Sequence, residues 1–459
     1  MPALRPGRRA ALALLPVTAL APAALAQPAA GSDPAVVAEA LFAVLEETRI
    51  AAAQWFAARG NPDAVPVLIR ALHLNRHGAP HAAVQAALLR LTGTTRPDWF
   101  AWMQWLQANP QLGVIPGHDR FLQRYFSWFD PGFPVFIHAS VAHRIRLEEV
   151  VWGGVGVDSI PALDNPPFAP AGAPPWTRPD DLVFGIEING DARAYPLRIL
   201  DWHEMFNDVI GGVPVALAYC TLCGSGILFE TLLPGREQPF VFGSSGLLWR
   251  SNKLMFDRAT NSLWNQFTGE PVVGPLANSG IRLRPRPVVI TTWAAWRATH
   301  PATRLLSRET GHARDYSPGA AYREYFASPD LMFPALTDDR RLAPKDYVFA
   351  LRGASVDKAW PLSLFAGGRV LNDVAGVLDI VLIGDAATRS VRAYRRDGLE
   401  FRAGGAPDRV VAGGQSWRVT EAALVAPNGR SLDRLPGHVA YWFAWAGYLG
   451  GQGELAGGR

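Results

Sequence analysis

One stretch of this chain occurs twice, and that repeat limits the folds open to it. Val183–Leu197 aligns with Val348–Leu362 at an offset of 165 residues, and Asn207–Gly211 aligns with Asn372–Gly376 at the same offset without a gap. Each copy predicts two strands joined by a turn, an aromatic–proline ending, an irregular or helical piece, an Asn-Asp turn and a further strand. We expect the two copies to pack together in an arrangement close to twofold symmetry.

The two copies differ where the side chains are reactive. Both copies keep the Asn-Asp pair, Gly211 and Pro196 or their counterparts, so the need for a shared shape explains those residues. Four reactive residues of the first copy are replaced in the second. At the same offset, His203 aligns with Gly368, Glu204 with Arg369, Cys220 with Asp385, and Cys223 with Thr388. This contrast predicts that the first copy carries the chemistry and that the second is structural.

The rest of the pattern predicts an α+β protein. Residues 33–112 have helical spacing and predict a small α-helical domain, in which the second and third helices resemble one HEAT-like pair. Residues 113–180 form a linker or transition, whose proline-rich part spans 165–176. A mainly β body follows, with a first repeat over 181–330 and a second, degenerate repeat over 345–448.

The first residues predict an export signal. Arg5, Arg8 and Arg9 precede an apolar run that is broken by two prolines, and Ala24–Ala26 fits a small-residue cleavage site. A signal peptide over 1–26 implies a periplasmic or secreted protein with no transmembrane span after cleavage. The route, general secretory or twin-arginine, is left open.

Charge and cysteine content narrow the classes of partner. A net charge of +4 on 459 residues, with no basic stripe interleaved with aromatic residues, argues against nucleic acid. The chain has 2 cysteines, three positions apart, which is too few for a disulfide framework. The expected partner is a small molecule or a periplasmic redox protein.

The chemistry-bearing stretch resembles a known family. The matching strings are Tyr195-Pro196, His203-Glu204, Asn207-Asp208, Tyr219–Gly224 and Ser251–Trp264. Together they resemble the bacterial and archaeal family catalogued as domain of unknown function 3179, closely over residues 180–325 and again at Tyr441–Trp445. Thr221 departs from the proline usual in that family, which puts the stiffness of the turn in doubt. The family has no settled activity, so the resemblance implies kinship.

A metal site is the first of three interpretations of the cluster. Cys220 and Cys223 have the spacing of a chelate loop, and His203 can add an imidazole. With the Met255 thioether as fourth ligand the donors are soft and favour copper, whereas Glu204 or Asp257 in its place favours zinc. Glu204 can instead orient the imidazole.

The other two interpretations need no metal. The Cys-x-x-Cys pair followed by Gly224 suits thiol–disulfide exchange, although it follows a strand and not the start of a thioredoxin-type helix. Alternatively, Cys220 and Cys223 form one structural disulfide in a non-catalytic binding module, and His203 is an ordinary core or surface histidine. If the protein is an enzyme, the residues predict a metal- or thiol-dependent oxidoreductase with His203, Glu204, Cys220 and Cys223 at its centre. All the functional interpretations require folding to bring His203 within reach of the two sulfurs.

Overall fold

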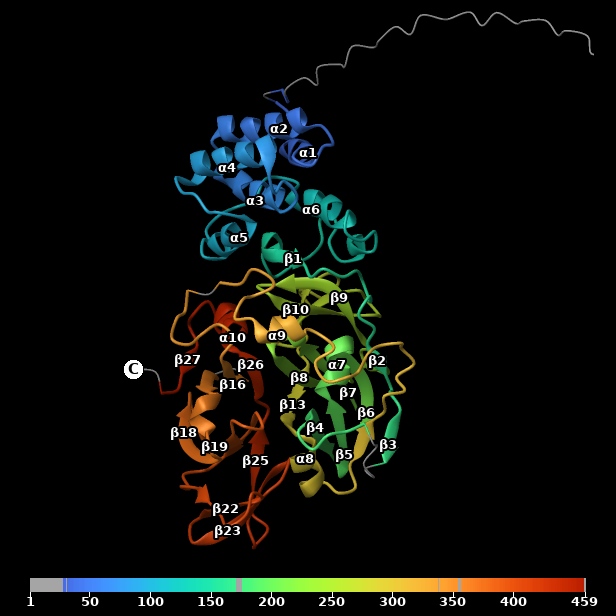
Figure 1. Ribbon diagram of the computed structural model, residues 1–459, viewed down its shortest axis with the longest axis vertical. Coiled ribbons are helices and arrows are strands. Elements are labelled where there is room, and N and C mark those ends of the chain that lie inside the picture. The colour runs from blue at the N-terminus through green and yellow to red at the C-terminus, as the bar shows by residue number, and fades with distance from the viewer. Residues whose placement is uncertain (1–27, 30, 171–175, 337, 354–355, 458–459) are drawn as a thin grey trace, which may run out of the picture.

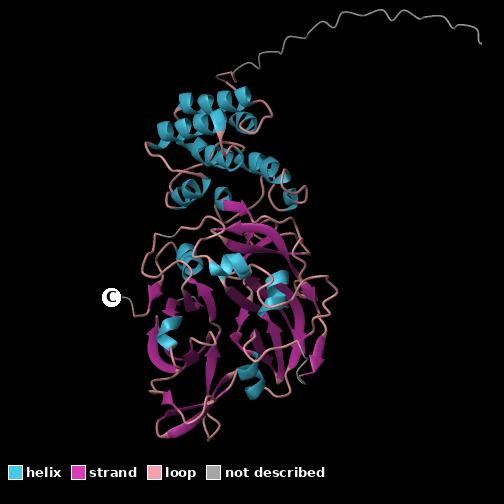
Figure 2. Ribbon diagram, viewed as in Figure 1, coloured by secondary structure: helices cyan, strands magenta, loops and turns pink. Residues whose placement is uncertain are grey.

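The computed structural model describes residues 28–29, 31–170, 176–336, 338–353 and 356–457 (Figure 1). A helical domain stands at one end, and a larger body rich in strands makes up the rest (Figure 2), in agreement with the α+β class. The expected signal peptide, 1–26, lies outside the described residues. Within the described ranges, no helix is long and apolar enough to cross a membrane.

The helical domain contains α1 (Pro34–Ala40), α2 (Glu46–Arg59), α3 (Val65–Leu74), α4 (Gly78–Thr92), α5 (Trp99–Gln107) and α6 (His118–Ser127), with a 3-10 turn at Pro62–Ala64. Asp33 and Asp98 begin α1 and α5, because their carboxylates accept hydrogen bonds from free backbone N–H groups of the first turn. Helix α6 lies within 113–180, so helical structure continues into the stretch expected as a transition. The likeness of the second and third helices to a HEAT pair stays a prediction.

The helical domain and the body share one apolar core. Buried residues of α1–α6 are continuous with residues of strands β9–β12, among them Leu254 and Phe256. Arg70 of α3 is fully buried, and its guanidinium donates hydrogen bonds to the carbonyl oxygens of Glu148, at 3.0 Å, and of Val150. Because unpaired buried carbonyls are costly, these bonds tie the helices to the start of the body.

The first part of the body holds three sheets, ordered β1-β9-β10-β11-β12, β13-β8-β7-β6-β2 and β14-β4-β5-β15-β3. Their strands are β1 (Val150–Trp152), β2 (Leu163–Asp164), β3 (Phe168–Pro170), β4 (Leu182–Ile188), β5 (Asp191–Pro196), β6 (Met205–Ile210), β7 (Val213–Cys220), β8 (Ser225–Glu230), β9 (Phe242–Trp249), β10 (Asn252–Asp257), β11 (Leu263–Asn265), β12 (Glu270–Val273), β13 (Arg284–Arg286), β14 (Val289–Thr292) and β15 (Arg304–Leu306). The short helices here are α7 (Leu197–His203), α8 (Trp293–Thr299) and α9 (Arg323–Ala327), with 3-10 turns at Phe133–Val135, Leu147–Glu149 and Thr221–Cys223.

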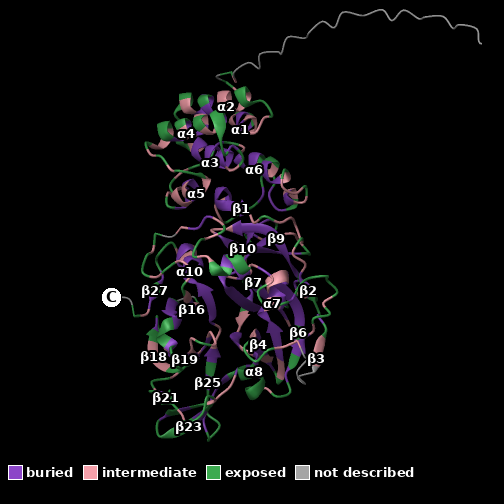
Figure 3. Cartoon of the chain, viewed as in Figure 1, coloured by how far each residue is buried: buried purple, intermediate pink, exposed green. Residues whose placement is uncertain are grey.

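The second part holds two sheets, ordered β26-β16-β17-β27 and β18-β19-β20-β25-β24-β23-β22-β21. Their strands are β16 (Tyr347–Gly353), β17 (Val356–Pro361), β18 (Arg369–Ala375), β19 (Leu378–Asp385), β20 (Ser390–Arg395), β21 (Arg402–Ala403), β22 (Arg409–Ala412), β23 (Gln415–Val419), β24 (Ala423–Val425), β25 (Ser431–Leu435), β26 (His438–Tyr441) and β27 (Glu454–Leu455). A 3-10 turn at Leu362–Phe365 and helix α10 (Trp442–Leu449) complete it. Figure 3 shows that β7, β16 and β10 are among the buried strands, whereas β23 is largely exposed.

Strand pairing follows the same register in the two parts. Val183 pairs with Pro196 across β4 and β5, and Val348 pairs with Pro361 across β16 and β17, 165 residues further along. The pairs that close the turn of the next hairpin also correspond, since Cys220 pairs with Ser225 and Asp385 with Ser390. The outer strands also correspond: β15 runs parallel to β5, as β27 does to β17.

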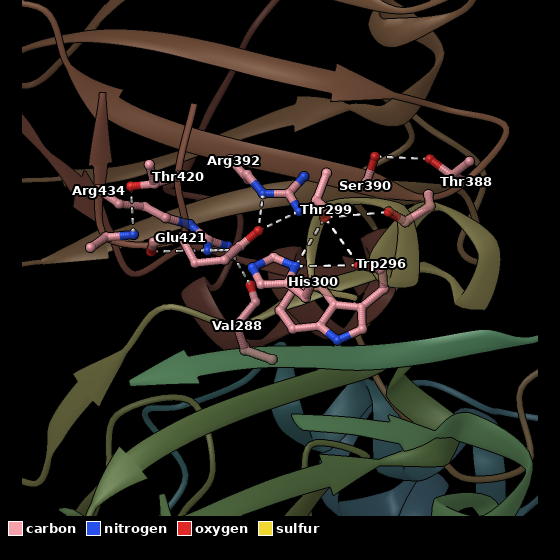
Figure 4. A network of polar contacts seen from close by, with 12 residues as sticks. Val288, Trp296, Thr299, His300, Thr388, Ser390, Arg392, Thr420, Glu421 and Arg434 are labelled. Carbon is pink, nitrogen blue, oxygen red and sulfur yellow. Dashed lines mark hydrogen bonds and ion pairs between the residues drawn. The ribbon is translucent and has the colours of Figure 1, made fainter. Parts of the chain in front are cut away.

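A buried polar network joins the two parts (Figure 4). Arg392 donates two hydrogen bonds to the Glu421 carboxylate, at 2.9 and 2.6 Å, and Arg434 contacts its other oxygen. Burial alone would raise the pKa of Glu421, but the two guanidinium groups outweigh it and lower that pKa to about 2. Arg434 also donates to the Val288 carbonyl of the first part, at 2.9 Å, so the network fixes one part against the other.

Candidate functional site

Cys220 and Cys223 form a disulfide at the turn between β7 and β8. Cys220 is the last residue of β7, a single 3-10 turn follows, and Gly224 adopts a left-handed conformation (φ 61°) that lets β8 start back along β7. The exposed fraction is 3% for Cys220 and 0% for Cys223. The structure therefore brings the two predicted cysteines together as a buried disulfide.

Two stacked tyrosines lie against this turn. A Cβ atom at Gly224 would lie 2.9 Å from a ring carbon of Tyr347 and 3.2 Å from one of Tyr441, so the close approach requires glycine there. The two rings stack with centroids 4.5 Å apart and their hydroxyl oxygens lie 3.0 Å apart. Arg389, in the counterpart turn of the second copy, donates to the Tyr347 hydroxyl at 2.9 Å. The second copy thus supplies part of the wall around the disulfide.

The backbone of the turn is held from two further sides. Tyr325 donates a hydrogen bond to the Leu222 carbonyl, between the two cysteines, at 2.6 Å. Cys223 Sγ lies 3.3 Å from the carbonyl oxygen of Ser251, an acceptor for the Cys223 thiol once the disulfide is reduced. The Thr221 hydroxyl is buried and has no hydrogen-bond partner among the described residues.

His203, the third predicted member, is directed elsewhere. Its Nδ1 lies 2.8 Å from the Pro161 carbonyl oxygen, and its Nε2 lies 2.6 Å from the Tyr316 hydroxyl. A carbonyl only accepts, so Nδ1 carries the proton and Nε2 accepts from Tyr316. Burial lowers the pKa of His203 to about 4, which keeps the ring neutral at pH 7. With both nitrogens engaged, the structure does not present this imidazole to the sulfurs, so the predicted centre of His203, Cys220 and Cys223 is not formed. Any chemistry at the cysteine pair has to proceed without His203.

Glu204 pairs with a lysine that the sequence does not single out. Its carboxylate lies 2.8 Å from Lys253 Nζ, and both side chains are largely buried. Tyr322 adds a longer contact, 3.5 Å from hydroxyl to carboxylate. The pKa of Lys253 is lowered by burial, against the opposing effect of Glu204. The carboxylate expected to tune His203 therefore neutralises a buried ammonium group instead.

The backbone of Glu204 also joins the turn. Glu204 has a left-handed conformation (φ 55°), which costs a non-glycine residue about 1 kcal/mol. That conformation ends α7 and directs the Glu204 carbonyl to the backbone N–H of Tyr219, at 2.8 Å. This backbone hydrogen bond fixes Tyr219, the residue before Cys220, to Glu204.

A second carboxyl group lies beside the turn. The Tyr219 hydroxyl lies 3.0 Å from Asp201 Oδ1. Burial raises the pKa of Asp201 to about 7, with a further rise from Glu204, while the bond from Tyr219 and the charge of Arg389 lower it. The offset of 165 could have identified both residues, because Asp201 stands opposite Ala366 and Tyr219 opposite Gly384.

Met255 and Asp257, the other predicted ligands, lie on β10. Met255 is fully buried and belongs to the same apolar cluster as Cys220 and Cys223. Asp257 accepts hydrogen bonds from Thr260 and from the Trp264 indole, at 2.7 to 2.8 Å. Asp257 therefore serves the turn that follows β10, as expected for an Asp-x-x-Thr sequence.

With the two cysteines oxidised to a disulfide, the predicted ligands do not form a metal site. The two sulfurs are bonded to each other, and both nitrogens of His203 have other partners. Within the ranges that the structure describes, no group of three or more His, Cys, Asp and Glu side chains could hold an ion. The chemistry that the arrangement supports is that of a buried disulfide next to two ionisable pairs, Glu204–Lys253 and Asp201–Tyr219.

Comparison with known proteins identifies the kinship of the body. A model for a family described as a protein of unknown function (DUF3179) matches residues 157–451, which include the whole candidate site and both copies. No curated protein matches the chain, and no solved structure does.

Proposed function

Because this chain belongs to the DUF3179 family, whose description assigns no activity, we propose a function from the site alone: an exported thiol–disulfide redox protein that exchanges two electrons at Cys220–Cys223. One observation carries the proposal. The disulfide closes a turn of the first copy, beside the ionisable pairs Glu204–Lys253 and Asp201–Tyr219, and the counterpart turn has none of these groups. Perturbed ionisable groups gathered at one spot are typical of functional sites.

The exchange step balances with a partner that carries two thiols. One partner thiolate attacks Cys220 Sγ, a mixed disulfide forms, the Cys220–Cys223 bond breaks, and Cys223 leaves as a thiolate. The partner's second thiolate then attacks its own sulfur and releases Cys220. The partner is oxidised to a disulfide, the protein is reduced to a dithiol, and the partner's two thiol protons end on Cys220 and Cys223. The reverse sequence oxidises the protein.

The ionisable pairs suit the proton transfers of this reaction. A carboxyl with a pKa of about 7, such as Asp201, is poised to give and take a proton near neutral pH. Tyr219, the residue before Cys220, connects Asp201 to the turn through its hydroxyl. Lys253 lies two residues after Ser251, whose carbonyl contacts Cys223. The Glu204–Lys253 ion pair is thereby joined to the segment that contacts Cys223.

The repeated register supports a duplicated origin of the body, in which the second copy keeps the scaffold. Asp208 accepts from Arg193 and Tyr195, and the Asp373 carboxylate accepts from the counterparts Lys358 and Trp360. The second copy retains this arrangement although its turn has lost the cysteines. Its role in our proposal is to wall the site with Tyr347 and Arg389.

Copper binding by the reduced protein is a second candidate, favoured by Met255. Its thioether shares the buried cluster of Cys220 and Cys223, and two thiolates with a thioether suit Cu(I). His203 is not needed for that ligand set. Anaerobic Cu(I) titration of the reduced protein tests this candidate: one bound copper, weakened in Met255→Leu, supports it, and no binding rejects it.

The redox proposal is tested by single cysteine variants. Cys223→Ser leaves Cys220, the less completely buried residue, to react with 5,5′-dithiobis(2-nitrobenzoate), whereas Cys220→Ser leaves only the fully buried Cys223. We expect the native Cys223→Ser protein to form the mixed disulfide at least about tenfold faster than Cys220→Ser, since reactivity follows access and thiolate character. If neither variant reacts before it is unfolded, the pair is a structural disulfide and the proposal fails.

A further inference from the structure

A surface segment of the first part crosses the candidate site. Residues 307–328, which we call the strap, connect β15 to the loop before β16 and contain only the short helix α9. In Figure 1 the strap and α9 lie over the face of the body that carries α7, the helix ending at His203. The strap lies outside both aligned stretches of the repeat.

Three tyrosines of the strap each bind a different component of the site. Tyr316 donates to His203 Nε2 at 2.6 Å, Tyr322 approaches the Glu204 carboxylate at 3.5 Å, and Tyr325 donates to the Leu222 carbonyl at 2.6 Å. The strap backbone adds one bond, from the Trp202 indole to the Asp315 carbonyl at 2.7 Å. The strap is therefore held to the very residues that the first copy does not share with the second.

Few residues of the strap are buried. Apart from Tyr316, Ala321 and Tyr325, its residues are exposed or only partly buried. Thr310 supports Tyr316 through a hydroxyl contact of 2.6 Å. Lys345 fixes the end of the strap, because its ammonium group donates to the Tyr325 carbonyl and, at 2.6 Å, to the Ser328 carbonyl. Segments with few buried contacts open with a small part of the global unfolding free energy.

The burial of both cysteines prevents the proposed reaction unless the strap moves. Thiol–disulfide exchange needs a partner sulfur to reach one sulfur of the pair, yet the exposed fractions are 3% and 0%. We propose that the strap is a lid: it leaves the turn as a unit, with the Tyr325–Leu222 bond as its latch, and admits the reductant to Cys220. This inference rests on the proposed function for its biological meaning, but lid opening itself can be measured without any redox partner.

The test uses a phosphine, tris(2-carboxyethyl)phosphine, which cleaves any disulfide that it can reach. Tyr325→Phe removes the latch hydroxyl and keeps the ring. We expect native Tyr325→Phe to be reduced about fivefold to tenfold faster than the unaltered protein, the effect of one lost hydrogen bond on the opening equilibrium. Tyr316→Phe provides a second latch variant, with a smaller acceleration, should the first fail to fold.

Tyr394→Phe is the matched control. Its hydroxyl donates to the Thr420 carbonyl at 2.7 Å, the same kind of bond, in the second copy and away from the strap. The lid predicts no acceleration in this variant. Equal acceleration in Tyr394→Phe, or none in Tyr325→Phe and Tyr316→Phe, would mean that reduction requires global unfolding and would overturn the lid. Because phosphine needs no redox activity of the protein, this failure is distinguishable from failure of the exchange proposal.

Hydrogen exchange gives an independent readout on the full chain. The lid predicts that amides of residues 308–324 exchange at least about a hundredfold faster than those of β7, through an opening that leaves β7 paired. Strap amides that exchange together with β7 would contradict it.

Discussion

The turns Cys220–Gly224 and Asp385–Arg389 occupy equivalent places in the two copies and are built differently. Each ends in a left-handed residue, Gly224 with φ 61° and Arg389 with φ 54°, and each closes the same type of hairpin. The second turn is held by ordinary polar contacts, from Asp385 to the Ala387 N–H and from Thr388 to the Ser390 hydroxyl. Because the hairpin forms without sulfur, the fold does not require a disulfide at this point.

A similar comparison separates the scaffold from the site elsewhere. Asn207 exchanges two hydrogen bonds with the backbone of Phe242, and Asn372 does the same with Phe401. The residues that are shared between copies therefore fix the backbone in both. The residues found only in the first copy gather around one turn.

The largest effect on stability is expected at the buried ion pair. Lys253→Ala should lower the free energy of unfolding by about 3 to 5 kcal/mol, because it leaves the Glu204 carboxylate buried without its partner. Arg369→Ala, at the exposed counterpart of Glu204, should change it by less than about 0.5 kcal/mol. Urea unfolding of both variants measures the difference. Similar losses in the two variants would show that the copies do not differ in the way we describe.

The next effect concerns the left-handed residues that end the turns. Gly224→Ala should cost about 2 kcal/mol, since the new methyl group meets the Tyr347 ring and the conformation disfavours a side chain. Arg389→Ala keeps a side chain that this backbone already accepts and loses one hydrogen bond, for about 1 kcal/mol. Thermal unfolding ranks the two variants. A greater loss in Arg389→Ala would place the tighter turn in the second copy.

The smallest effect is a pH dependence at Asp201, which has no titratable counterpart at Ala366. Its folded-state pKa of about 7 lies above the ordinary value of 3.8, so its contribution to stability is complete below pH 4 and is lost as the pH rises to 7. After allowance for partial exposure, the loss is on the order of 1 kcal/mol. Asp201→Asn should remove that part of the pH dependence of unfolding. A variant whose profile between pH 4 and 7 matches that of the unaltered protein would contradict the raised pKa.

The sequence predicts the features that are local or repeated. The register of the hairpins follows from the offset of 165, and the turn at Asp257 follows from its neighbours. The sequence does not predict where His203 points, because the direction depends on Pro161 and Tyr316, which are distant in sequence. The sequence also does not predict that the strap covers the site. Its tyrosines lie outside the repeat, so no comparison between the copies could identify them.

A redox equilibrium on the native protein tests most directly whether the turn of the first copy is an exchanging disulfide. The protein is equilibrated with mixtures of reduced and oxidised dithiothreitol, quenched with acid, alkylated and weighed by mass spectrometry. We predict a reversible transition between zero and two alkyl groups per chain while the far-ultraviolet circular dichroism stays constant. A pair that accepts alkyl groups only after denaturant has unfolded the body would contradict the proposal and leave Cys220–Cys223 as a structural bond.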